Sequence, residues 1–276
     1  MERWTKTCDD SLVKVAAAQI ACALGDVDAN LRKMRDFSAR AKNEGAELVV
    51  FPEASDTGYS MPVIRDLAKP WSEGAVPALQ EMAKELSLTI VAGVSERAGD
   101  VVYNSQVFIN SRGDLVASYR KTHLFVLPPN DESTCYTAGD KFVNVPTAEF
   151  NFGLSICYDL RFPEVARALA LEHDANVLLV SSAWPLPRVA HLRALAIARA
   201  IENQSYLVLA NRTGVDAGVT CCGTSAIIDP SGLVLASATG YRQELLTADI
   251  SAEEIAAVRN KIPVFNHRRP ELYGKD

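Results

Sequence analysis

The sequence contains no apolar run long enough to form a membrane-spanning helix. Such a helix needs about 20 consecutive apolar residues, and no stretch of the 276-residue chain approaches that length. The first ten residues, MERWTKTCDD, also lack the apolar segment of a secretory signal. We therefore expect a cytoplasmic protein with no membrane partner.

Cysteine and histidine are too few and too scattered to indicate a metal site or a disulfide framework. The six cysteines form no CxxC pair, and the adjacent Cys221 and Cys222 cannot easily bridge one another. The four histidines show no metal-ligand spacing, and no HExxH motif occurs. The sequence therefore predicts reduced thiols and no bound metal.

Glycine-rich motifs for nucleotide cofactors are absent as well. No GxGxxG, GxxxxGKS or GxxxxGKT occurs, so a nucleotide cofactor is not indicated. The formal net charge of -6 disfavours a nucleic-acid partner, because the phosphate backbone attracts basic surfaces. With 48% hydrophobic and 22% charged residues, the chain has the composition of an ordinary globular protein.

What the sequence does contain is a regular alternation of strand-like and helix-like segments. Parallel pairing is expected where a helix joins two apolar strands, and the turn at 111–114 predicts a hairpin. We therefore expect one α/β domain over residues 1–276, with a core at about 13–250 and a C-terminal extension at 251–276. Two mixed sheets with outer helices would bury the apolar strands. The predicted strands are 13–20, 47–51, 88–94, 101–110, 115–119, 142–145, 150–156, 175–181, 206–210, 224–229, 233–236 and 244–248.

Residues 148–164, AEFNFGLSICYDLRFPE, combine a strand, a cysteine and a helix start. A thiol at such an elbow is lifted off the sheet and lies near the first N–H groups of a helix, which favour negative charge. Cys157 is therefore a candidate nucleophile. The alternative is that Cys157 is simply a small buried residue. The stretch narrowly misses the GxSxG elbow, and Ser155 would lie inside the strand, so Ser155 is discounted.

Two further polar residues follow apolar strands. Glu53 comes after Pro52 at the end of one strand, and Lys121 comes directly after the predicted hairpin. A carboxylate and an ammonium beside Cys157 would supply a proton acceptor and a stabiliser of negative charge. Either residue alone could equally belong to a surface ion pair.

Three sequence blocks resemble the signature blocks of the nitrilase superfamily of carbon–nitrogen hydrolases. They are Phe51–Glu53, Tyr119–Phe125 and Cys157–Glu164, and the resemblance runs from about Lys14 to Ile250. It implies a four-layer α-β-β-α sandwich, no metal or organic cofactor, and a homodimer or larger homo-oligomer.

The same resemblance implies roles for individual residues. Glu53, Lys121 and Cys157 would form a catalytic triad, and the backbone N–H of Tyr158 would help to bind the oxyanion. A second glutamate is implied in the loop after the lysine block, where Glu132 is the match and Asp131 is its neighbouring competitor.

The segment Trp184–Arg188 and residues 198–204 are similar to the omega-amidase branch, which hydrolyses monoamides of dicarboxylic acids such as 2-oxoglutaramate or succinamate. An arginine can clamp the free carboxylate of such a substrate. Arg161 and Arg188 are candidates, although Arg161 is favoured to pair with Asp159 or Glu164 and Arg188 could be a plain exposed arginine. Tyr59 and Trp184 either line the pocket or pack in the core.

Other readings stay open at this point. The same triad would serve a deaminated glutathione amidase, an N-carbamoyl amidohydrolase or a true nitrilase. The chain could also be a catalytically silent binding protein on the same scaffold. The Ala-rich helix at 189–201 suits either a dimer interface or the core, and the role of the C-terminal tail is open.

Overall fold

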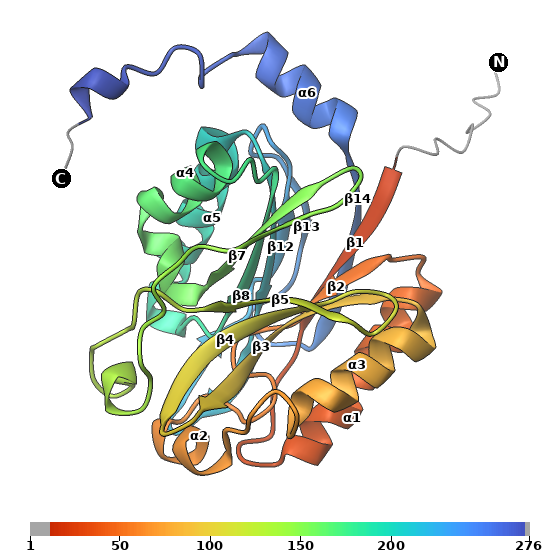
Figure 1. Cartoon of the computed structure of the whole chain (residues 1–276), viewed down its shortest axis with the longest axis vertical. Helices are drawn as coiled ribbons and strands as arrows, with labels where there is room; N and C mark the ends of the chain where they lie inside the picture. The colour runs from red at the N-terminus through yellow and green to blue at the C-terminus, as the bar shows by residue number, and fades with distance from the viewer. Residues whose placement is uncertain (1–11, 274–276) are drawn as a thin grey trace.

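A computed structural model describes residues 12–273 (Figure 1). Cys8, one of the six expected thiols, lies outside the described residues. None of the described helices is both long and apolar enough to cross a membrane.

Two six-stranded sheets form the centre of the molecule (Figure 1). The first contains β1 (Leu12–Gln19), β2 (Leu48–Val50), β3 (Thr89–Ala98), β4 (Val101–Ile109), β5 (Leu115–Arg120) and β14 (Glu244–Ser251). The second contains β6 (Asn144–Pro146), β7 (Asn151–Ile156), β8 (Val177–Ser182), β9 (Tyr206–Asn211), β12 (Ala226–Ile228) and β13 (Val234–Ser237).

The two sheets follow the same pairing plan. The first has the order β14-β1-β2-β3-β4-β5, and the second has the order β13-β12-β9-β8-β7-β6. In each sheet the three central strands, β1-β2-β3 or β9-β8-β7, pair in parallel. The strands outside them pair antiparallel. Both sheets are therefore mixed, as the predicted hairpins indicated.

Helices cover the outer face of each sheet (Figure 1). On the first sheet, α1 (Val27–Asn43) and α3 (Ala75–Leu86) pack against the outward-facing side chains. On the second, α4 (Pro163–Leu171) and α5 (Val189–Asn203) do the same. This confirms the predicted α-β-β-α sandwich. The remaining helices are α2 (Met61–Leu67) and α6 (Ala252–Lys261).

Strand β1 shows how sequence alternation builds the layers. Val15 and Ala17 belong to the core between the sheets, whereas Ala16 and Ala18 pack under the helices of the first sheet. Successive side chains of a strand point to opposite faces, so a strand covered on both sides must be apolar throughout. The all-apolar runs of the sequence are therefore the strands at the middle of the sandwich.

Several predicted helix boundaries are confirmed by their caps. The Asp26 side chain accepts a hydrogen bond from the Ala29 N–H at the start of α1, and α1 ends just before Gly45, which has a φ of 86°. The capping box predicted at α6 is half formed. Ser251 accepts from the Glu254 N–H, but the Glu254 carboxylate binds the Tyr206 hydroxyl.

The structure differs from the prediction in two places, a hairpin that was not predicted and the C-terminal tail. β10 (Thr213–Asp216) and β11 (Val219–Cys222) pair antiparallel as a separate two-stranded sheet. Each strand has only four residues, too short for a periodic signal. The tail was expected to be extended, yet it contains a short 3-10 helix at Pro270–Leu272.

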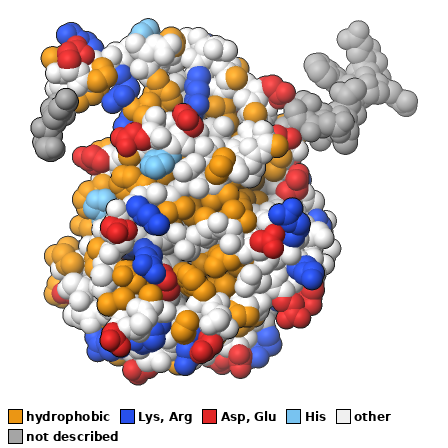
Figure 2. All heavy atoms as spheres, in the orientation of Figure 1, with side chains coloured by type: hydrophobic (Ala, Val, Ile, Leu, Met, Phe, Trp, Pro, Cys, Tyr) orange, Lys and Arg blue, Asp and Glu red, His pale blue; other side chains and the backbone are white. Residues whose placement is uncertain are grey.

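The face drawn in Figure 2 carries acidic and basic side chains in an interspersed pattern. A nucleic-acid surface instead gathers basic side chains along one face or stripe. This face has no such arrangement, in keeping with the net charge of -6.

The backbone of β3 approaches the end of β2 too closely for any side chain at Gly93. A Cβ there would lie 2.5 Å from the Glu53 Cα and 2.6 Å from the Pro52 carbonyl oxygen. We predict that Gly93→Ala lowers the free energy of unfolding by about 3 kcal/mol or more, because backbone has to move. Urea unfolding measures this loss.

Gly99→Ala is the matched control for this prediction. Gly99 has a φ of 61° and open space around its Cα, so alanine there should cost only the left-handed strain of about 1–2 kcal/mol. Equal losses for the two variants would contradict the close approach at Gly93.

Candidate active site

The three predicted catalytic side chains come from strand ends at one end of the sandwich. Glu53 follows β2, Lys121 follows β5 and Cys157 follows β7. The first two strands belong to one sheet and β7 belongs to the other. The carboxyl ends of strands in α/β sheets are the usual place for ligands.

Lys121 lies between two glutamates. Its Nζ is 2.8 Å from Glu53 Oε1 and 2.9 Å from Glu132 Oε1, and all three side chains are fully shielded from solvent. The structure therefore brings Glu132, rather than its neighbour Asp131, to the lysine. Asp131 instead accepts hydrogen bonds from the N–H and hydroxyl of Ser133.

Burial and the attraction between opposite charges shift the pKa values of Lys121 and Glu132. Burial alone would lower the pKa of Lys121, but the carboxylates of Glu132 and Glu53 raise it well above its usual value. Lys121 is therefore a permanent cation. Burial raises the pKa of Glu132, against the lowering effect of Lys121.

Further donors hold both carboxylates. Glu53 Oε2 accepts from the Ala183 N–H at 2.8 Å, and Glu132 Oε2 accepts from the Phe125 N–H at 2.6 Å. The Tyr59 hydroxyl donates to Glu132 Oε1 at 2.8 Å. Tyr59 was predicted as a pocket residue, so its contact with Glu132 is an additional finding.

Asn104 is a site residue that sequence reasoning missed. Its Nδ2 donates to Glu53 Oε1 at 2.7 Å and to Glu132 Oε1 at 2.9 Å. The only signal in the sequence was three adjacent polar residues, Asn104–Gln106, within the run 101–109. Nothing in the sequence singles out Asn104 among these three residues, so the signal was too weak to identify it.

Cys157 lies at a strained elbow between β7 and a 3-10 helix, Cys157–Arg161. Its φ is 43°, a conformation that side chains other than glycine rarely adopt and that clusters at functional sites. The backbone N–H of Tyr158 is in the first turn of this helix, where N–H groups have no intrahelical acceptor. The oxyanion role of this N–H stays a prediction.

The Cys157 thiol is protonated at rest. Burial and then the neighbouring Glu53 carboxylate raise the pKa of the thiol well above its usual value, although Lys121 acts in the opposite direction. A thiol of this kind needs a base before it can attack a carbonyl.

Asp159 ties the cysteine elbow to the lysine segment, which the sequence did not reveal. Its buried carboxylate accepts from the Ile156 N–H at 2.9 Å, from the Tyr119 hydroxyl at 2.8 Å and from the His123 N–H at 3.1 Å. These bonds fix the residue before Cys157 relative to the end of β5.

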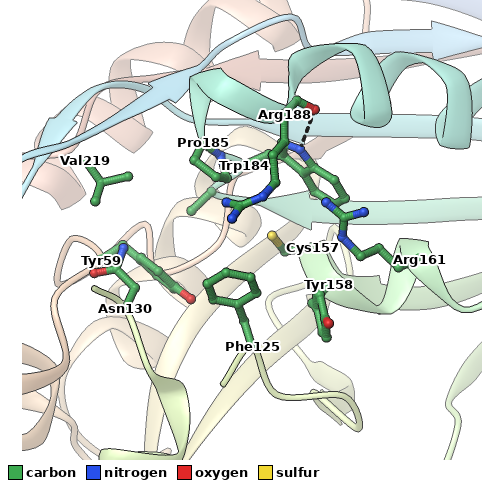
Figure 3. Close-up of a pocket in the computed structure, with 11 residues that line it drawn as sticks. Tyr59, Phe125, Asn130, Cys157, Tyr158, Arg161, Trp184, Pro185, Arg188 and Val219 are labelled. Carbon is green, nitrogen blue, oxygen red and sulfur yellow. Dashed lines mark hydrogen bonds between the residues drawn. The ribbon is translucent and has the colours of Figure 1, made fainter. Parts of the chain in front are cut away.

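All four residues predicted to bind substrate line one pocket with Cys157 (Figure 3). The pocket encloses about 410 Å³, its open mouth included. The four are Tyr59, Arg161, Trp184 and Arg188, and the wall also includes Phe125, Asn130, Tyr158, Ala183, Pro185 and Val219. The volume suits a small molecule.

The favoured ion pair of Arg161 with Asp159 or Glu164 was wrong. Among the described residues neither carboxylate pairs with it, because Asp159 is fully buried and already bonded to the lysine segment. The Arg161 guanidinium lies instead over the Trp184 ring, 4.5 Å from its centroid.

Arg188 is half-buried rather than freely exposed. Its guanidinium carbon lies 5.6 Å from the centroid of the Phe125 ring, and its backbone carbonyl accepts from Trp184 Nε1 at 2.9 Å. Figure 3 shows the guanidinium groups of Arg188 and Arg161 on either side of the Cys157 sulfur in that view. Within residues 12–273, no group of three or more acidic, histidine or cysteine side chains could hold a metal ion.

Comparisons with known proteins agree with this geometry. The family described as carbon-nitrogen hydrolase matches residues 14–260. The chain is 37% identical to a 2-oxoglutaramate amidase of Bacillus subtilis, over 98% of this chain and 100% of the relative. It is 36% identical to a nitrilase of Pyrococcus abyssi, over 95% and 99% of the two chains.

A solved structure shows the same fold. A member of branch 10 of the nitrilase superfamily from Saccharomyces cerevisiae matches with a TM-score of 0.86 and 29% identity, covering 95% of this chain and 97% of that chain. With matches of this extent in sequence and in structure, the chain belongs to the carbon–nitrogen hydrolase family, as its three sequence blocks predicted.

Proposed function

We propose that the protein is a cysteine-dependent amidase that releases ammonia from a small amide with a free carboxylate, such as 2-oxoglutaramate or succinamate. One observation carries this proposal. The Cys157 thiol shares its pocket with two guanidinium groups, Arg161 and Arg188, that have no carboxylate partner among the described residues. Like charges placed together without a counterion favour an anionic ligand.

Acylation begins with proton transfer from the thiol to Glu53. The Cys157 sulfur then attacks the amide carbonyl. Lys121 and the Tyr158 N–H stabilise the oxyanion, a contribution of about 3 kcal/mol for each donor. The Lys121 cation serves this purpose at every working pH, because its pKa is raised well above the usual value.

Protonated Glu53 then gives its proton to the departing ammonia, which leaves a thioester on Cys157. A water molecule replaces the ammonia, and Glu53 takes one of its protons as the water attacks the thioester. The products are the free carboxylic acid and the original thiol. Glu132 holds Lys121 in place and orients the amide of the substrate.

The carboxylate end of the substrate lies at Arg188, with Arg161 beside it. Arg161 is fixed by stacking on Trp184, whereas Arg188 faces Phe125. An arginine binds a carboxylate through two parallel hydrogen bonds, which also fixes the direction of the substrate. The 2-oxoglutaramate amidase of Bacillus subtilis, by its name, acts on a compound of this class and supports the assignment.

We also propose that the protein works as a homodimer or larger homo-oligomer in the cytoplasm. The five cysteines in the described part of the chain are all free, which suits a reducing compartment. The side chain of Ile201, at the end of α5, is 49% exposed and could be covered by a second copy.

The direct test is ammonia release by Cys157→Ala. Because the thiol is the nucleophile, we predict a loss of at least about 1,000-fold in kcat/KM with an unchanged melting temperature. Cys135→Ala is the matched control, since Cys135 is half-buried and does not line the pocket. Full ammonia release by Cys157→Ala would refute Cys157 as the nucleophile, whereas no ammonia release by the wild-type protein would leave a silent binding scaffold as the better account.

The same assay identifies the substrate class. The panel contains 2-oxoglutaramate, succinamate, deaminated glutathione, an N-carbamoyl amine and a simple nitrile. We expect the first two to be hydrolysed best. A preference for one of the other three would assign the chain to the corresponding alternative activity while keeping Cys157 as nucleophile.

The proposed contact between Arg188 and the substrate carboxylate is tested by removing the charge from either partner. We predict that Arg188→Ala lowers kcat/KM for succinamate about 10- to 100-fold, the value of hydrogen bonds to a charged group. The methyl ester of succinamate should be a poor substrate for the wild-type enzyme and should be little affected by Arg188→Ala.

Arg193→Ala controls for a general change in charge, because Arg193 is an exposed arginine on α5, the helix that begins directly after Arg188. Equal ammonia release from the acid and its ester by the wild-type enzyme would rule out the carboxylate contact.

A further inference from the structure

We propose that Asn104 is a positioning residue that joins the two active-site glutamates and directs the thiol proton to one oxygen of Glu53. This inference rests on the proposed function in one respect, namely that Glu53 acts as the base.

Asn104 and Lys121 bridge the same two carboxylate oxygens. Lys121 Nζ lies 2.8 Å and 2.9 Å from Glu53 Oε1 and Glu132 Oε1, and Asn104 Nδ2 lies 2.7 Å and 2.9 Å from the same atoms. Two carboxylates sharing a buried site repel one another. The ammonium offsets this repulsion with charge, and the amide offsets it with a neutral donor.

The orientation of the Asn104 amide is forced by these neighbours. The opposite orientation would place a carbonyl oxygen against two carboxylate oxygens. In the observed orientation, Asn104 Oδ1 is buried and has no hydrogen-bond partner among the described protein atoms. Leaving a buried acceptor unpaired is costly and calls for an explanation. Here the explanation is that Nδ2 gains hydrogen bonds to both carboxylates, which offset the unpaired Oδ1.

Asn104 also holds the backbone of the lysine. Its carbonyl oxygen accepts from the Lys121 N–H at 2.8 Å, and its side chain is 1% exposed. The residue therefore fixes the position of Lys121 at both ends, through the main chain and through the carboxylates that bind Nζ.

These contacts leave only one oxygen of Glu53 for catalysis. Oε1 accepts from both Lys121 and Asn104, whereas Oε2 accepts from the Ala183 N–H alone. Ala183 and Cys157 line the same pocket, so Oε2 is held at the wall that contains the thiol. With a single hydrogen-bond donor, Oε2 is the oxygen of Glu53 that is freer to take a proton. Asn104 makes Oε2 the acceptor by occupying Oε1.

The test compares Asn104→Leu and Asn104→Asp with Gln106→Met. Gln106 is the matched control, because it is two residues along β4, fully buried, and bonded to Ser181 rather than to the carboxylates. Two profiles are measured for each folded variant. One is kcat and KM against pH, and the other is the rate of Cys157 alkylation by iodoacetamide against pH, located by peptide mass spectrometry.

The two Asn104 variants should change the pH profiles in opposite ways. Asn104→Leu removes the shared donor, so the carboxylate pair gains a proton more easily. We expect the acid limbs of the kcat/KM profile and of the alkylation profile to move to higher pH by about one unit. We also expect kcat to fall about 10- to 100-fold, with KM changed by no more than about threefold. Asn104→Asp can donate only while protonated, so its alkaline limb should move to lower pH.

Several results would overturn the proposal. The proposal fails if Asn104→Leu keeps the wild-type kcat and the wild-type pH profiles. It also fails if kcat falls no further in Asn104→Leu than in Gln106→Met. If Asn104→Leu does not fold, Asn104→Asp with an unshifted alkaline limb is equally decisive. The alkylation profile needs no substrate. It therefore still tests Asn104 if the wild-type protein hydrolyses none of the proposed amides, a result that would refute the proposed function alone.

Discussion

One buried cation, the Lys121 ammonium, holds this active site together. Removing two carboxylates and an ammonium from water costs several kcal/mol for each ion, and attraction offsets that cost only with good geometry and further hydrogen bonds. The fold supplies both. Strand ends from one sheet deliver Glu53 and Lys121, the short 3-10 helix Glu132–Thr134 delivers Glu132, and β4 delivers Asn104. Loss of Lys121 would leave two buried carboxylates without a countercharge.

The cost of burying these charges has a chemical purpose. The same burial keeps the Cys157 thiol protonated at rest, so a proton acceptor at Glu53 has to be ready beside it. The strained elbow at Cys157 is held by Asp159, which binds the backbone on one side and the lysine segment on the other. The side chains proposed as nucleophile, base and oxyanion-binding cation are thus fixed before substrate enters.

Site residues that directly follow apolar strands could be predicted from the sequence. Residues that contact the site through partners distant in the sequence could not. Glu53 and Cys157 follow recognisable strands and belong to matching blocks, so the layers and the placement of these two residues after β2 and β7 were predictable. Asn104 is one polar residue within a strand, and its partners are distant in sequence. Arg161 was assigned to a carboxylate nearby in sequence, yet Asp159 binds the end of β5. Pairings of this kind depend on sheet packing, which local patterns do not encode.

The central claim is that Cys157 attacks the amide carbon and carries the acyl group. Rapid quenching in acid during turnover of the best amide, followed by peptide mass spectrometry, tests it most directly. The account predicts a transient adduct on the peptide that contains Cys157, with the mass of the substrate less ammonia, which forms and decays at rates that match turnover. An adduct on another cysteine, or turnover with no adduct at Cys157 at any quench time while the acylated peptide is shown to survive the acid, would contradict it.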